Sequence, residues 1–148
     1  MKIVFDRPTI YMSHPIRGSN DDLEGNTRRA VKASERLKGL FPEVNLYCPG
    51  EHDLSLQVLW NNGTLTVEQI MEADLEILSA CHGWLFYYFD ESSGSMIEAK
   101  RAYELDLPRT VIVSDIAKLS TPRLRLMLTP FVIETIERFR SNKNEQQI

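Results

Sequence analysis

The segment DESSGSMIEAKRA, residues 90–102, places hydroxyls, a glycine and a carboxylate at the start of a predicted helix. Three serines surround Gly94, and hydroxyls and backbone N–H groups at a helix start can hold a phosphate. Glu98 would then be an ionised carboxylate beside that phosphate, which suits a nucleophile. Ser95 and Glu98 also have the spacing of a capping box, which is a purely structural role. The segment alone leaves both interpretations open.

A second loop with anion-binding content is HPIRGSN, residues 14–20, which follows the first predicted strand. The Arg17 guanidinium is a planar fork of donors, and Gly18 lets the backbone approach a ligand closely. The loop has neither the GxGxxG pattern of dinucleotide-binding domains nor the GxxxxGK[ST] pattern of a P-loop. An ordinary strand-to-helix loop with a solvent-facing arginine is the alternative.

Asp74 and Tyr11 are the remaining candidates for chemistry. Asp74 lies within MEADLEIL, beside the apolar stripe of a predicted helix, where an acid needs either a partner or solvent. Tyr11 is in the first strand and can donate a hydrogen bond into a site, although a strand tyrosine is more often part of the core. The three histidines have no HxxxH or HxH spacing, so we expect no metal site.

The composition of the chain limits its function classes. It has 148 residues and a net charge of -4, so no basic surplus favours binding to duplex nucleic acid. Cys48 and Cys81 form no CxxC pair, and we expect two reduced thiols near the core. No signal peptide opens the chain and no run reaches eighteen apolar residues. These features predict a cytoplasmic protein without a membrane partner.

Apolar strands alternate with amphipathic helices along the chain, and the third and fourth strands are apolar enough to be buried on both faces. The predicted strands are residues 9–13, 44–48, 84–89 and 110–114. The predicted helices are residues 23–40, 67–81 with a Thr66–Gln69 capping box, 95–105 and 129–140. Residues 49–63 predict a long loop with one helical turn.

This alternation predicts an α/β fold, a single Rossmann-like (flavodoxin-like) domain over residues 1–148, with a mainly parallel sheet and helices on both faces. Such sheets bind ligands at the carboxyl ends of their strands, near a topological switch point. We therefore expect the loops after the first and third strands, residues 14–22 and 90–95, to form the functional site.

The order and spacing of YMSHPIRG, an ADLEIL helix, an apolar strand and SSGSMIEAKRA resemble the nucleoside 2-deoxyribosyltransferase superfamily. Within it, the chain resembles the nucleoside 5′-monophosphate N-glycosidases, which include 2′-deoxynucleoside 5′-phosphate N-hydrolases and cytidine monophosphate hydrolases. The resemblance covers about residues 9–113 and is dense only in the three motifs. It implies a homodimeric enzyme that needs no cofactor and splits a nucleotide into free base and sugar 5-phosphate.

The resemblance also implies roles for individual residues. Glu98 matches the nucleophile of a Ser-x-Gly-x-x-x-Glu motif, and Asp74 matches a helix Asp that positions the substrate and protonates the base. Tyr11 opens the matched Tyr-x-x-x-x-Ile-Arg-Gly segment and is the third catalytic candidate. The implied phosphate contacts are Ile16, Arg17, Gly18, Ser19, Ser92 and Gly94. His52 and Trp60, in the loop of residues 49–63, are candidates for binding the base.

The chain departs from the hydrolases at His14-Pro15, where these enzymes often have Gly-Ser, and at Ala99-Lys100, where Leu-Gly or Ile-Gly often follows the nucleophile. A further departure is His82, near the place where an Asp often opens the third strand. Two other functions stay open. One is a deoxyribosyltransferase that passes the sugar to a second base. The Arg17-Gly18 pair argues against this function, because transferases of unphosphorylated nucleosides generally lack that pair. The other is a nucleotide-binding module without turnover.

Overall fold

The structure is a computed structural model that describes residues 3–52, 58–59 and 61–146. Its centre is a parallel sheet of four strands, which lie in the order β2-β1-β3-β4. The strands are β1 (Thr9–Ser13), β2 (Asn45–Tyr47), β3 (Gly83–Tyr87) and β4 (Arg109–Ile112). This is the order of a flavodoxin-like sheet, so the predicted Rossmann-like α/β fold is confirmed.

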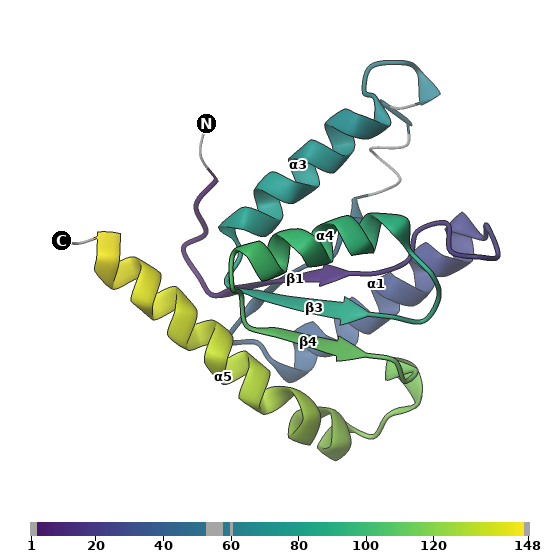
Figure 1. The fold of residues 1–148 in the computed structure, drawn as a ribbon. Helices are drawn as coiled ribbons and strands as arrows, with labels where there is room; N and C mark the ends of the chain where they lie inside the picture. The colour runs from purple at the N-terminus through teal and green to yellow at the C-terminus, as the bar shows by residue number, and fades with distance from the viewer. Residues whose placement is uncertain (1–2, 53–57, 60, 147–148) are drawn as a thin grey trace.

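Helices cover both faces of the sheet, as Figure 1 shows. They are α1 (Leu23–Leu40), α3 (Val67–Ala80), α4 (Ser93–Glu104) and α5 (Thr121–Gln146), with short 3-10 turns η1 (Pro49–Glu51) and η2 (Ile116–Lys118). Helix α1 has the predicted bounds, and α3 begins at the predicted Thr66–Gln69 capping box. None of the helices in the described part of the chain is long and apolar enough to cross a membrane.

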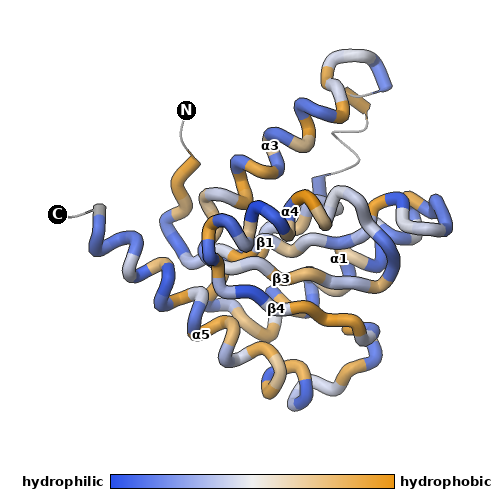
Figure 2. Tube along the Cα trace, in the orientation of Figure 1, coloured by the Kyte–Doolittle hydropathy of each residue, from blue (hydrophilic) through white to orange (hydrophobic). Residues whose placement is uncertain are grey.

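The pleat of β1 and β3 divides the core into two layers. Ile10 and Met12 pack with side chains of α1 and α5, whereas Tyr11 packs with side chains of α3 and α4. Figure 2 shows hydrophobic residues within β3 and toward the C-terminal end of β4, in contrast to the hydrophilic C-terminal end of α5. Tyr11 and the other residues of its face therefore point toward α4, which carries Glu98.

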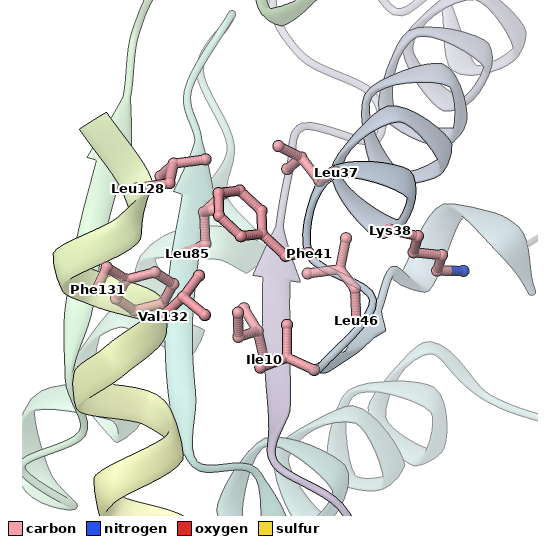
Figure 3. A pocket seen from close by; sticks show the side chains of 10 residues that line it. Ile10, Leu37, Lys38, Phe41, Leu46, Leu85, Leu128, Phe131 and Val132 are labelled. Atoms are coloured by element: carbon pink, nitrogen blue, oxygen red, sulfur yellow. The ribbon is translucent and has the colours of Figure 1, made fainter. Parts of the chain in front are cut away.

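The layer between the sheet, α1 and α5 is closely packed. Figure 3 shows Phe41 from the end of α1, Phe131 from α5 and Leu85 from β3 meeting around a small gap, while the Lys38 ammonium points away from it. The gap has a volume of only about 10 Å³ and an apolar lining, so it holds no ligand. This layer is a structural core, and the chemistry has to be sought on the other face or at the strand ends.

Among the predicted elements, β4 and α5 differ most from the structure. Strand β4 is not buried on both faces, because it lies at the sheet edge and pairs only with β3 among the described strands; Val111 is 53% exposed. Helix α5 starts at Thr121 rather than near residue 129, since Ser120 accepts a hydrogen bond from the Arg123 N–H and the helix continues through Pro130. Its predicted end at residue 140 is also wrong, as the helix extends to Gln146.

Candidate functional site

The candidate site lies at the carboxyl ends of β1 and β3. These strands are neighbours in the sheet, but the helices that follow them, α1 and α4, cover opposite faces, so the crevice between them is a topological switch point. The loops after both strands meet there. The Ser95 hydroxyl donates to the His14 carbonyl at 3.2 Å, and Ser19 donates to Asp90. The structure therefore brings together the two loops that the sequence indicated, residues 14–22 and 90–95.

The start of α4 excludes one of the two interpretations of Glu98, the capping box with Ser95. Ser92 is extended, and its hydroxyl accepts a hydrogen bond from the Ser95 N–H at 3.1 Å, which makes Ser92 the N-cap. The predicted capping box of Ser95 and Glu98 is wrong, because the helix begins three residues earlier than that box requires. Glu98 consequently lies beyond the first turn, where its carboxylate is not needed for the cap.

The Glu98 carboxylate instead accepts hydrogen bonds from two hydroxyls of β1. The Tyr11 phenol donates to Glu98 Oε2, and the Ser13 hydroxyl donates to Oε1 at 2.8 Å. The Trp84 indole N–H donates to Ser13 Oγ at 2.7 Å and so directs the Ser13 proton toward Glu98. Burial, and next the negative charge of Glu98, raise the pKa of Tyr11 well above its usual value. Tyr11 therefore remains a protonated donor, and the carboxylate is held in one orientation.

A chain of aromatic rings connects this carboxylate to Asp74. The Tyr11 and Tyr47 ring centroids are 5.3 Å apart, and the His52 ring stacks on Tyr47 at 5.2 Å. The Tyr47 phenol donates to Asp74 Oδ1 over 3.4 Å, a long and weak hydrogen bond. The structure thus brings together four of the sequence-predicted residues, and it adds Tyr47.

Asp74 has an unusual protonation equilibrium for an aspartate. Burial raises its pKa from 3.8 to about 6, and the hydrogen bond from Tyr47 and the charge of His52 only partly oppose that rise. A carboxyl group with such a pKa is protonated in about half of the molecules at pH 6 and in about a tenth of them at pH 7. It can therefore donate a proton, which an ordinary surface aspartate cannot do efficiently.

The predicted phosphate loop already holds an anion, the carboxylate of Asp90. The Ser19 backbone N–H donates to Asp90 Oδ2 at 2.8 Å, and the Ser19 hydroxyl donates to Oδ1 at 2.7 Å. Gly18 has a φ of +61°, and a Cβ there would collide with the Asp90 carboxylate, so this position favours glycine. The hydrogen bonds from Ser19 lower the pKa of Asp90. The loop is thus shaped to bind a negatively charged group.

The other predicted phosphate contacts surround this loop. Ile16 and Arg17 are exposed, and the buried Asn26 amide holds their carbonyls at 3.0 Å each. The Arg17 guanidinium lies 3.8 Å from the Asp21 carboxylate. The Ser92 oxygen is used in the helix cap, whereas the N–H of Gly94 is in the first turn and has no intrahelical acceptor.

Two of the departures from the hydrolase pattern can be explained without a role in the chemistry: His14 has a structural role, and Lys100 lies on the outer side of α4. His14 is buried, and its Nε2 accepts a hydrogen bond from the Gly50 N–H at 2.9 Å, which ties the end of β1 to η1. Burial lowers the pKa of His14, which keeps the ring neutral for this contact. Lys100 is exposed and lies 4.0 Å from the Glu104 carboxylate on the outer side of α4.

Sequence reasoning missed Tyr47, Trp84 and Asp90 as parts of this site. Tyr47 could have been found, because it ends β2 at the carboxyl edge of the sheet, where ligands bind. Trp60, predicted to bind the base, lies outside the described residues. Among the residues that are described, no group of three or more histidine, cysteine or acidic side chains could hold a metal ion. Cys48 and Cys81 are buried and form no disulfide.

Comparison with known proteins adds no assignment. No protein-family model matches the chain, and neither the curated proteins nor the solved structures contain a match. A function therefore has to be inferred from the residues at the switch point and their geometry.

Proposed function

We propose that this chain hydrolyses the N-glycosidic bond of a nucleoside 5′-monophosphate, with a free base and a sugar 5-phosphate as products. The placement of Glu98 carries the proposal. Its carboxylate takes no part in the helix cap and accepts hydrogen bonds from Tyr11 and Ser13 at the switch point. A carboxylate held in a fixed orientation by rigid elements is a suitable nucleophile for the anomeric carbon of a sugar.

In the first step, one oxygen of Glu98 attacks C1′, and the bond from C1′ to the base nitrogen breaks with its electron pair going to the base. The hydrogen bonds from Tyr11 and Ser13 hold the carboxylate in one orientation for this attack. The product is a glycosyl ester of Glu98. In the second step, water attacks C1′, its proton passes to the group that protonated the base, and the bond from C1′ to Glu98 breaks, as in retaining glycoside hydrolases.

The departing base needs a proton, and Asp74 is the proposed donor. Its pKa of about 6 lets it give up a proton and recover it near neutral pH. The rings of Tyr11 and Tyr47 connect Glu98 to Asp74, and the exposed His52 ring, which stacks on Tyr47, offers a face on which a base can stack. His52 keeps its predicted role in base binding within this proposal.

The 5′-phosphate is proposed to bind between the loop of residues 16–19 and the start of α4. Ser19 supplies a backbone and a side-chain donor, and the first-turn N–H groups of α4 supply the positive end of a helix dipole. A phosphate in this position has to displace the Asp90 carboxylate from Ser19. Arg17, at the exposed edge of the loop, is then placed to neutralise part of the phosphate charge.

One observation favours a second candidate, a deoxyribosyltransferase that acts on an unphosphorylated nucleoside. The Asp90 carboxylate occupies the donors of Ser19, and a carboxylate would hydrogen-bond a 5′-hydroxyl but repel a phosphate. The transferase would use the same Glu98 ester and replace the attacking water by a second base. A nucleotide-binding module without turnover is the third possibility left by the sequence.

The deciding experiment incubates the protein with ribo- and deoxyribonucleoside 5′-monophosphates and with the matching nucleosides, with and without a second base. The proposal predicts free base from monophosphates only, independent of the second base. Base exchange from nucleosides would support the transferase instead. Nucleotide binding without any base release would contradict both enzymes and leave the binding module.

The resemblance also implies a homodimer, and the sequence features predict a cytoplasmic protein; both remain proposals. Arg123 and Arg125 on α5 are exposed and are the residues that we expect to reach a partner's site. Sedimentation of the protein at micromolar concentration tests the dimer, since a monomer at all concentrations would contradict it.

A further inference from the structure

A second pocket lies on the other side of the sheet from Glu98. It has a volume of about 430 Å³ and is formed by the outer side of α1 and the turn η2. Tyr87, which lines it, belongs to the layer that packs with α1 and α5, whereas Tyr11 and Glu98 belong to the α4 side. Its volume is in the range of small-ligand sites, about 300–1,000 Å³. The proposed catalytic chemistry uses none of its residues.

The lining of this pocket is strongly basic although the chain as a whole carries a net charge of -4. Arg28, Arg29, Lys32 and Arg36 line it, against a single carboxylate, Asp115. Glu24 pairs with Arg28 at 2.9 Å outside the lining, where both side chains are exposed and the pair is worth little. The Lys32 ammonium has no carboxylate within ion-pair distance among the residues that the structure describes.

Two of the arginines are held in place before any ligand binds. The Arg29 guanidinium lies 4.4 Å from the Phe89 ring centroid, and its Nε–H donates to the Tyr87 hydroxyl at 3.2 Å. Arg36 donates to the backbone carbonyl of Ile116 in η2. Arg29 is only loosely paired with Asp115, at 3.9 Å. Fixed guanidinium groups with little neutralisation are preorganised for an anion, because fewer rotamers have to be frozen on binding.

The spacing of the charges indicates the kind of anion. Residues 28 to 36 span about 12 Å along α1 at 1.5 Å per residue, so their charged groups form a row rather than a single cluster. An orthophosphate is too small to contact more than part of that row. We infer that this pocket is a binding site for a triphosphate group, either inorganic tripolyphosphate or the triphosphate of a nucleotide, separate from the Glu98 site.

Calorimetric titration of the whole protein tests this inference, with tripolyphosphate, a nucleoside triphosphate and orthophosphate in Mg²⁺-free buffer of about 150 mM ionic strength. Lys32→Glu reverses one pocket charge and breaks no ion pair within the described part of the chain, so the fold should be retained, as circular dichroism would check. Lys100→Glu makes the same charge change on the exposed side of α4. Charges farther apart than about 8 Å are largely screened at this ionic strength.

The wild-type protein should bind both triphosphates more tightly than orthophosphate. Lys32→Glu should weaken triphosphate binding about tenfold or more, the effect expected for loss of a charge-assisted contact, while Lys100→Glu leaves it unchanged. Much tighter binding of the nucleotide than of tripolyphosphate would assign the site to nucleotides. Failure of the wild-type protein to bind either triphosphate would overturn the inference. The inference would also be overturned if triphosphate binding survived in Lys32→Glu and were lost in Arg17→Glu, since the ligand would then occupy the loop of residues 16–19.

Discussion

Replacement of Asp74 by asparagine should stabilise the protein while it impairs base release. A pKa that rises from 3.8 to about 6 corresponds to about 3 kcal/mol of preference for the protonated carboxyl in the fold. Above pH 6 this group is ionised in both the folded and the unfolded chain, so the fold carries that cost in full. The asparagine side chain is neutral and keeps an oxygen that can accept from Tyr47. Since the site is only half-buried, solvent screening reduces the expected gain to about 1–3 kcal/mol.

The gain should depend on pH in a defined direction. The pKa of Asp74 is higher in the folded chain than in the unfolded chain. The loss of stability caused by the ionised carboxyl is therefore fully present above pH 6, shrinks between pH 6 and 3.8, and is absent below pH 3.8. Urea unfolding of wild-type and Asp74→Asn proteins at about pH 8 and pH 4 measures it, with equal m-values as the check for two-state behaviour. Glu72→Gln, an exposed change on the same helix, is the control and should alter stability little.

The same variant should lose activity. If Asp74 protonates the leaving base, its replacement should reduce the rate of base release by about 10²- to 10⁴-fold, the usual range for general acid catalysis. A variant that is more stable at pH 8 and less active would show that Asp74 is retained for chemistry at a cost in stability. A variant that is less stable than wild type at pH 8, or equally changed at both pH values, would refute the reasoning.

Three further substitutions test the parts of the site separately. Tyr11→Phe removes a hydrogen bond to the Glu98 carboxylate. Because hydrogen bonds to charged groups are worth about 1.5–3 kcal/mol, base release measured in single turnovers should slow by roughly 10- to 100-fold. An unchanged rate would mean that the phenol does not position the nucleophile. Tyr47→Phe removes a hydrogen bond that lowers the pKa of Asp74, so the alkaline limb of the pH–rate profile should move to higher pH; a shift to lower pH would contradict the assigned donor. Asp90→Asn removes the internal anion from the phosphate loop and should lower the KM for monophosphates while kcat changes little; a higher KM would show that Asp90 supports substrate binding instead.

The sequence predicted the elements that local patterns specify. Helix α1 was predicted to the residue, because its apolar spacing starts after Asp22 and stops at Phe41, which caps it. The position of the loops after β1 and β3 at one edge of the sheet also followed from sequence, since parallel strands place their carboxyl ends at the same edge. The function proposed for that edge stays a prediction until it is tested.

The differences between the sequence-based predictions and the structure arise from tertiary structure. Ser92 and Ser95 are both plausible N-caps in sequence, and which one is extended depends on how the loop leaves β3. The apolar sequence of β4 does not reveal that it lies at the edge of the sheet, because that depends on strand order. The particular contact between Asp90 and Ser19 joins residues 71 positions apart and has no sequence signature.

The central claim is that Glu98 forms a covalent bond to the sugar, and mass spectrometry of acid-quenched single turnovers tests it most directly. Wild-type protein mixed with the panel of nucleoside 5′-monophosphates should carry a transient sugar 5-phosphate adduct on the peptide that contains Glu98. Glu98→Gln should form no adduct and release no base, while its circular dichroism remains that of the wild type. An adduct on another residue, or base release that persists in Glu98→Gln, would contradict the account.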